Sequence, residues 1–168
     1  LHLGVRRQRQ MCIRDRALAC SPKLLLADEP TTALDATVQI QILLLLRQLQ
    51  RELGMSIIFV THDVGVATEI ADELAVMYAG KIVEIGDVAD VIKKPAHPYT
   101  QGLLSSTVNS GSKGKRLEVI GGSPPDMSKL FKGCAFSPRC KKVLDQCWHQ
   151  QPAPETLSTN QIASCFNI

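Results

Sequence analysis

Apolar residues gather in two short runs in the first third of the chain, and each run ends at polar residues. The run at 23–27 is followed by Asp28 and Glu29, and the run at 56–61 is followed by His62. Runs of about five apolar residues with polar ends are typical of strands that are buried on both faces of a sheet. We therefore predict a strand at each place.

Between the two runs, apolar residues return every three or four positions, which predicts an amphipathic helix. Asp35 is placed to cap its first turn, and Gly54 is placed to end it. The apolar stripe consists of Val38, Ile42, Leu45, Leu49 and Leu53. A second helix is predicted at 64–71.

A third strand is predicted at 73–78, and a turn at 79–81 leads into a fourth apolar segment at 82–85. Strands that alternate with helices indicate an α/β fold, with a parallel sheet covered by helices on both faces. The functional residues of such a sheet lie at the carboxyl ends of its strands. The residues in that position are Asp28, Glu29, His62 and Asp63.

The pattern changes near residue 95, and we divide the chain there into domains 1–95 and 96–168. Residues 109–115 are rich in Gly, Ser and Lys, which predicts an exposed linker. Residues 121–168 show no sustained period but contain four of the six cysteines. A short segment of this kind usually needs cross-links or a metal to hold it.

Length and composition predict a folded chain. The 168 residues are 45% hydrophobic, which provides enough apolar surface for a sizeable core. Apolar runs such as 42–46 are far shorter than the roughly 20 residues of a membrane-spanning helix, so we expect no membrane span. The first residues lack the features of a signal peptide, and we expect the chain to begin within a longer protein.

The net charge of +3 is concentrated at the start of the chain. Residues 1–16 carry five arginines and one aspartate, whereas the other 152 residues carry 14 basic and 15 acidic side chains. Beyond the first tract there is no basic face and no aromatic interleaving that would stack bases. We therefore expect no nucleic-acid partner.

The carboxylate pair at the end of the first strand suits phosphoryl transfer, which needs a carboxylate for Mg²⁺ and a group that activates water. Asp28 would hold the ion, directly or through water, and Glu29 would act as the base. Taken alone, the pair is explained about equally well as a polar exit from a strand.

Two longer segments favour the catalytic interpretation. Residues 24–35 (Leu-Leu-Leu-Ala-Asp-Glu-Pro-Thr-Thr-Ala-Leu-Asp) and residues 57–63 (Ile-Ile-Phe-Val-Thr-His-Asp) resemble the Walker B, D-loop and switch-histidine segments of ATP-binding cassette (ABC) transporter ATPases. The resemblance implies that His62 contacts the γ-phosphate of ATP and holds the water against Glu29. It also implies that Asp35 works across the interface of two such domains. Without this context, His62 would more often be a satisfied loop histidine.

Three segments of the second half, 94–104, 120–125 and 133–140, resemble the C-terminal extension of oligopeptide and dipeptide importer ATPases, which some nickel importers share. The resemblance extends over 17–168. It implies a peripheral subunit at the cytoplasmic face of the cell membrane that hydrolyses ATP with Mg²⁺ to energise peptide import. The implied partners are a second ATPase subunit, identical or different, two transmembrane permease subunits and, indirectly, a periplasmic or lipid-anchored solute-binding protein.

The four C-terminal cysteines are Cys134, Cys140, Cys147 and Cys165, with the spacing C-x5-C-x6-C-x17-C. This spacing lacks the CxxC pair that is common in structural zinc sites. Four thiolates are a complete ligand set for a [4Fe–4S] cluster, and the resemblance implies such a cluster here. Zinc and free or paired thiols are the alternatives, although a cytosolic ATPase disfavours structural disulfides.

The chain contains no Gly-x4-Gly-Lys-Ser/Thr phosphate loop, so we expect it not to bind ATP tightly alone. One alternative function is therefore an inactive truncated module that binds metal or a partner. Another is a soluble ABC-type ATPase that acts on nucleic acid or ribosomes.

Residues 1–16 depart from the pattern of the resembled family. Arg14, Asp15 and Arg16 stand where a helix with mainly apolar residues would be expected to pack. Our hypothesis is that this tract is not wholly native sequence.

Overall fold

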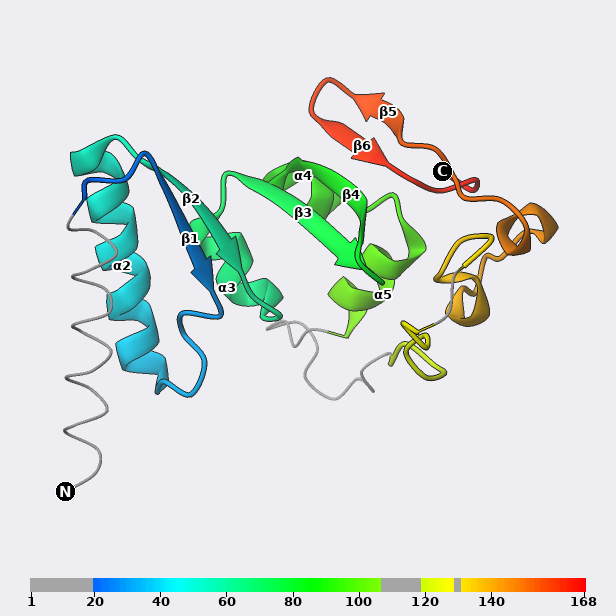
Figure 1. Ribbon diagram of the computed structural model, residues 1–168, viewed down its shortest axis with the longest axis horizontal. Helices are drawn as coiled ribbons and strands as arrows, with labels where there is room; N and C mark the ends of the chain where they lie inside the picture. Colours follow the sequence, from blue (N-terminus) through cyan, green and yellow to red (C-terminus); the bar gives the residue numbers. More distant parts are fainter. Residues whose placement is uncertain (1–19, 107–118, 129–130) are drawn as a thin grey trace. The chain divides into compact units, whose positions relative to one another are not determined.

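The computed structural model describes residues 20–106, 119–128 and 131–168 (Figure 1). These residues form a mixed α/β structure, which is the predicted class, and the chain divides into two compact units, Leu1–Ile70 and Ala71–Ile168. The domain boundary near residue 95 stays a prediction. The hypothesis about residues 1–16 and the predicted linker at 109–115 both lie outside the described residues. Within the three described ranges, no helix is both long enough and apolar enough to cross a membrane.

The first unit contains a parallel pair of strands. Strand β1 (Leu24–Asp28) pairs with β2 (Ser56–Val60), so that Asp28 lies opposite Val60. Helix α2 (Ala36–Leu53) connects the strands and runs alongside them in Figure 1, and α3 (Val64–Ile70) follows β2. Because the strands are parallel, their carboxyl ends lie at the same edge of the sheet.

Helix α2 begins and ends at the predicted residues. The Asp35 carboxylate accepts a hydrogen bond from the Val38 N–H at 2.9 Å, which satisfies a free donor of the first turn. Gly54 ends the helix in the left-handed conformation, with φ of 60°, and its N–H donates to the carbonyl of Gln50. Both ends therefore follow from local side-chain chemistry.

The predicted burial of the strands on both faces is not seen in the described residues. Side chains alternate along each strand, and the exposed face includes Leu26, which is 69% exposed, and Ile58, which is 51% exposed. These two residues are register partners, so one whole face of the pair is uncovered.

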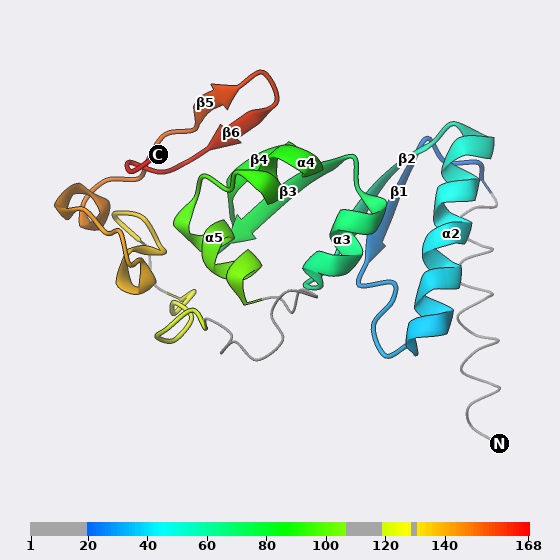
Figure 2. The ribbon, with the colours of Figure 1, turned by 180° about the vertical axis from the view of Figure 1, so that it is seen from behind.

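The second unit contains an antiparallel sheet in the order β3-β4-β6-β5 (Figure 2). Strands β3 (Glu73–Tyr78) and β4 (Lys81–Asp87) form a hairpin, and β6 (Gln161–Ala163) and β5 (Glu155–Ser158) extend it. The third predicted strand is therefore present, but it belongs to a separate antiparallel sheet rather than to the parallel one.

The turn of the β3–β4 hairpin consists of two residues, Ala79 and Gly80. Their φ angles are 49° and 76°, both in the left-handed region. Two consecutive residues of this kind give the tight turn whose twist matches that of antiparallel strands.

Two helices of this unit were not predicted. Helix α4 (Val88–Lys93) follows β4, and α5 (Pro98–Ser105) begins at a proline, which is favourable at the first helical position because its missing N–H has no helical partner. The cap of α5 is His97, whose Nδ1 accepts a hydrogen bond from the Tyr99 N–H at 3.0 Å. A histidine cap is an uncommon signal, and so the start of α5 was missed.

The core of the second unit joins the hairpin to the cysteine-rich segment. The ring of Phe136 packs against Tyr78 and Tyr99, with ring centroids 5.2 and 5.4 Å apart. Such aromatic pairs contribute beyond the apolar area that they bury. Two short 3₁₀ turns, η2 (Ser137–Arg139) and η3 (Asp145–Trp148), complete the segment.

Glu84 of β4 is a buried carboxylate, only 1% exposed, that receives three hydrogen bonds. The backbone N–H groups of Ala96 and His97 donate to it at 2.8 and 2.9 Å, and the Gln161 side chain donates at 2.8 Å. A buried charge is tolerated when it is paired in this way. Glu84 therefore joins β4 to the loop before α5 and to β6.

Replacing Glu84 by alanine should lower the free energy of unfolding by roughly 3 kcal/mol, because three buried donors lose their acceptor. The matched control is Glu73→Ala, which removes an exposed carboxylate from β3 and should change stability by less than about 0.5 kcal/mol. Denaturant unfolding measures both. Equal stabilities of the two variants would show that Glu84 does not hold the loop.

Candidate functional site

Glu29 and His62 lie side by side where β1 and β2 end. The Glu29 N–H donates to the Val60 carbonyl at 2.9 Å, so the pairing of the two strands extends to Glu29. Nδ1 of His62 lies 2.7 Å from Oε1 of Glu29. The structure thus brings together the two residues that were predicted as catalytic.

The backbone of Glu29 is in the left-handed region, with φ of 47°. This conformation is uncommon for a residue with a side chain, and it is found more often at functional sites. Glu29 begins a turn in which the Thr32 N–H donates to its carbonyl at 3.1 Å. The Thr32 hydroxyl also donates to Oε2. Both carboxylate oxygens are therefore engaged, and Thr32 is a contact that sequence analysis did not identify.

Each member of the pair shifts the pKa of the other. The hydrogen bond with His62, followed by the one with Thr32, lowers the pKa of Glu29. The hydrogen bond to Glu29 and its negative charge raise the pKa of His62. Because the His62 side chain is 80% exposed and that of Glu29 is 37% exposed, water screens this pair. The pair therefore orients two groups more than it stabilises the fold.

The other predicted carboxylates occupy separate places. Asp28 is exposed at the end of β1, and Asp35 caps α2. Asp63 accepts a hydrogen bond from the Val66 N–H at 3.2 Å, in the first turn of α3. Across the described ranges, no three His, Cys, Asp or Glu residues are arranged around one point as metal ligands. A Mg²⁺ site at Asp28 and an interface role for Asp35 therefore stay predictions.

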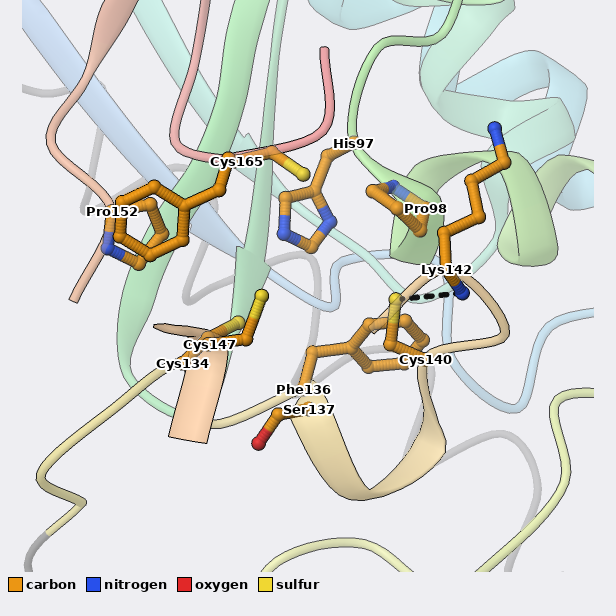
Figure 3. A pocket seen from close by; sticks show the side chains of 11 residues that line it. His97, Pro98, Cys134, Phe136, Ser137, Cys140, Lys142, Cys147, Pro152 and Cys165 are labelled. Carbon is orange, nitrogen blue, oxygen red and sulfur yellow. Dashed lines mark hydrogen bonds between the residues drawn. The ribbon is translucent and has the colours of Figure 1, made fainter. Parts of the chain in front are cut away.

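The four C-terminal cysteines line one cavity in the second unit (Figure 3). Cys147 is buried, and Cys134, Cys140 and Cys165 are half-buried, all four as free thiols. The cavity volume is about 10 Å³, which is space for one water-sized sphere. Residues that are 31 positions apart in the sequence are thus gathered around one small space.

Backbone N–H groups face three of the sulfurs. The Lys142 nitrogen lies 3.4 Å from the sulfur of Cys140. At the same distance, the Leu144 nitrogen faces the sulfur of Cys147 and the Asn167 nitrogen faces that of Cys165. The first of these contacts is the dashed line in Figure 3. Burial raises the pKa of the Cys134, Cys140 and Cys165 thiols, whereas N–H donors of this kind favour thiolates. Hydrogen bonds to sulfur also tune iron–sulfur clusters.

A close backbone approach holds two of the cysteines together. The Cys134 N–H donates to the Cys147 carbonyl at 2.8 Å. A Cβ on the preceding Gly133 would lie 2.3 Å from that carbonyl oxygen, so only glycine permits the approach. Sequence analysis missed Gly133, since its constraint comes from a residue 14 positions away.

The donor set fits a thiolate-bound group by its chemistry: four free thiols share one cavity, and backbone donors face them. In the described parts of the chain, however, no three of these thiols are arranged so that they could bind one metal ion. Rotation of the cysteine side chains would therefore have to accompany binding.

His97 lines the same cavity as the cysteines and was not predicted as a site residue. Its side chain is almost fully buried, and this burial lowers its pKa to about 4. The imidazole is consequently neutral near pH 7.

Comparisons with known proteins place the chain among transport ATP-binding proteins. Residues 83–147 match the family described as the C-terminal region of the oligopeptide/dipeptide transporter. The chain is 47% identical over 150 residues to the oligopeptide transport ATP-binding protein AppD of Bacillus subtilis, covering 89% of this chain and 46% of that protein. It is 47% identical over 163 residues to OppD of Salmonella typhimurium, covering 97% and 48%.

A third relative, the dipeptide transport ATP-binding protein DppD of Bacillus subtilis, is 44% identical over 158 residues, covering 94% of this chain and 47% of that protein. The chain therefore belongs to the family of oligopeptide and dipeptide transport ATP-binding proteins. It spans about half the length of the curated relatives that it matches.

An NMR titration of the His62 ring tests the pair. We expect a pKa above the usual value of about 6.5, and Glu29→Gln should bring it back toward that value because the carboxylate is gone. Asp63→Asn, which keeps a helix-capping oxygen, is the control and should lower the pKa less.

The sign of the pH dependence follows from the two shifts. Glu29 and His62 are both charged only at pH values between their two pKa values. The ion pair is therefore lost as pH rises through the raised pKa of His62, or as pH falls through the lowered pKa of Glu29. The same His62 pKa in wild type and Glu29→Gln would contradict the pairing.

Proposed function

We propose that this chain is part of an ABC-type ATPase subunit that energises the import of peptides, with Glu29 and His62 at its hydrolytic centre. The observation that carries the proposal is the Glu29–His62 pair, 2.7 Å apart at the ends of two parallel strands. The relatives support it, because their names describe ATP-binding proteins of oligopeptide and dipeptide transport. All of these relatives are transport proteins, which disfavours a soluble ATPase acting on nucleic acid or ribosomes.

In this mechanism Glu29 takes a proton from the water that attacks the γ-phosphate of ATP. Mg²⁺, held by Asp28, would supply charge stabilisation to the phosphate oxygens. Nδ1 of His62 faces Glu29, and the carboxylate favours the protonated ring, which carries an N–H on each nitrogen. Its Nε2–H would therefore be available to donate toward a phosphate oxygen, and the ring is exposed enough for this contact. Thr32 and His62 would hold the two oxygens of the base in a fixed orientation.

The two hydrogen bonds also restrain the base. They lower the pKa of Glu29, which makes its carboxylate a weaker proton acceptor.

The relatives also support a proposal for the partners and the location. We propose that the subunit pairs with a second ATPase subunit, identical or different, with Asp35 near their interface. The pair would act on two transmembrane permeases at the cytoplasmic face of the membrane, and a solute-binding protein would deliver the peptide. The uncovered apolar face of β1 and β2 would be covered in the complete protein, as in a sheet with helices on both faces.

We also propose that Cys134, Cys140, Cys147 and Cys165 hold a [4Fe–4S] cluster. The support is chemical: four free thiols line one cavity, and backbone N–H groups face the sulfurs. Zinc bound by the same thiols is the alternative that the following measurement distinguishes.

Glu29→Gln in the complete subunit, assembled with its partner and permeases, should lower the ATPase rate at least about 100-fold and leave ATP binding intact, because the amide cannot accept the proton. Glu52→Gln changes an exposed glutamate of α2 and should leave the rate unchanged. Undiminished hydrolysis by the Glu29 variant would remove Glu29 from the role of base.

Protein purified without oxygen should contain about four iron and four sulfide per chain and absorb visible light. Cys147→Ser should lose most of this iron, whereas Cys20→Ser, which changes a cysteine outside the cavity, should retain it. Iron-free, sulfide-free and colourless wild-type protein would contradict the cluster, and one bound zinc per chain would establish the alternative.

A further inference from the structure

His97 lines the same cavity as the four cysteines, but the contacts that fix its position come from β4 and from the first turn of α5. Its side chain is 1% exposed, and its backbone N–H donates to Glu84 at 2.9 Å. Its Nδ1 accepts the Tyr99 N–H at 3.0 Å as the cap of α5, and its ring packs against Phe136 with a centroid distance of 5.8 Å. The imidazole therefore cannot turn without releasing the first turn of α5.

These contacts fix the tautomer of the ring. Because Nδ1 accepts a hydrogen bond from a backbone N–H, it carries a lone pair, and the proton of the neutral imidazole is on Nε2. His97 therefore brings to the cavity an N–H donor rather than a lone pair.

The cavity provides sulfur as the acceptor. In Figure 3 the imidazole is drawn between the sulfur of Cys165 and those of Cys134 and Cys147. All four thiols line the cavity with it. Three of the sulfurs already have a backbone nitrogen at 3.4 Å. His97 adds a side-chain N–H donor to these main-chain donors.

We propose that His97 donates its Nε2–H to a sulfur atom of the group held by the four cysteines, and that it is not a ligand of that group. This inference rests on the proposed cluster. A hydrogen bond to a cluster sulfur stabilises the reduced form, which carries more negative charge, and so raises the reduction potential. His97 is thus a positioning and tuning residue, and the loop that carries it is held by Glu84.

The test is a redox titration of the anaerobically purified protein and two variants. His97→Asn and His97→Ser both retain an oxygen that caps α5 but lose the imidazole N–H. Both should keep the wild-type iron content and have a more negative reduction potential. His149→Asn, which changes an exposed histidine in the same segment, is the control and should have the wild-type potential.

The other outcomes separate this inference from the function on which it rests. Full iron content with an unchanged potential in both His97 variants would overturn the donor role and leave the cluster in place. Loss of iron from both folded variants would make His97 a ligand, which also overturns the inference. Wild-type protein without iron would overturn the cluster itself, and the role of His97 with it.

Discussion

The register between β1 and β2 is the constraint on which the candidate hydrolytic site depends. Asp28 lies opposite Val60, and the next N–H, that of Glu29, donates to the Val60 carbonyl. A slip of one residue would send every side chain of β1 to the other face. Glu29 would then turn away from His62. The backbone pairing therefore fixes the geometry of the carboxylate–imidazole pair, and Thr32 refines it.

In the second unit, Glu84 has the corresponding role. It holds the backbone of His97 and the side chain of Gln161, the first residue of β6. Cys165 follows β6 by two residues, so the pairing of β6 with β4 also limits where this thiol lies. The histidine and the last cysteine thus reach the same cavity because one buried carboxylate joins both of their segments to β4.

Local signals were enough to predict much of the first unit from sequence. The Asp35 cap and the Gly54 stop act within one turn of α2, and the ends of β1 and β2 are marked by their own polar residues. The exposed face of the two strands could not be anticipated, because burial depends on what covers a sheet. The turn at 79–81 predicted the hairpin of β3 with β4, whereas the placement of β3 in a sheet separate from the parallel strands is a tertiary outcome.

Distant partners explain what was missed in the second unit. Glu84 and Gln161 are 77 positions apart, and no periodic pattern connects them. The cysteine spacing gave the number and type of donors, but their convergence on one cavity depends on contacts such as that of Gly133 with the Cys147 carbonyl. His97 shows no periodic signal either, because its part in the site arises from the cap of α5.

The central claim is that ATP is hydrolysed at the carboxyl ends of β1 and β2. The most direct measurement is an experimental structure of the complete subunit, with its partner subunit, bound to a non-hydrolysable ATP analogue and Mg²⁺. We expect a γ-phosphate oxygen within hydrogen-bond distance of His62 and a water molecule between that phosphate and Glu29. A γ-phosphate bound away from both residues would contradict it.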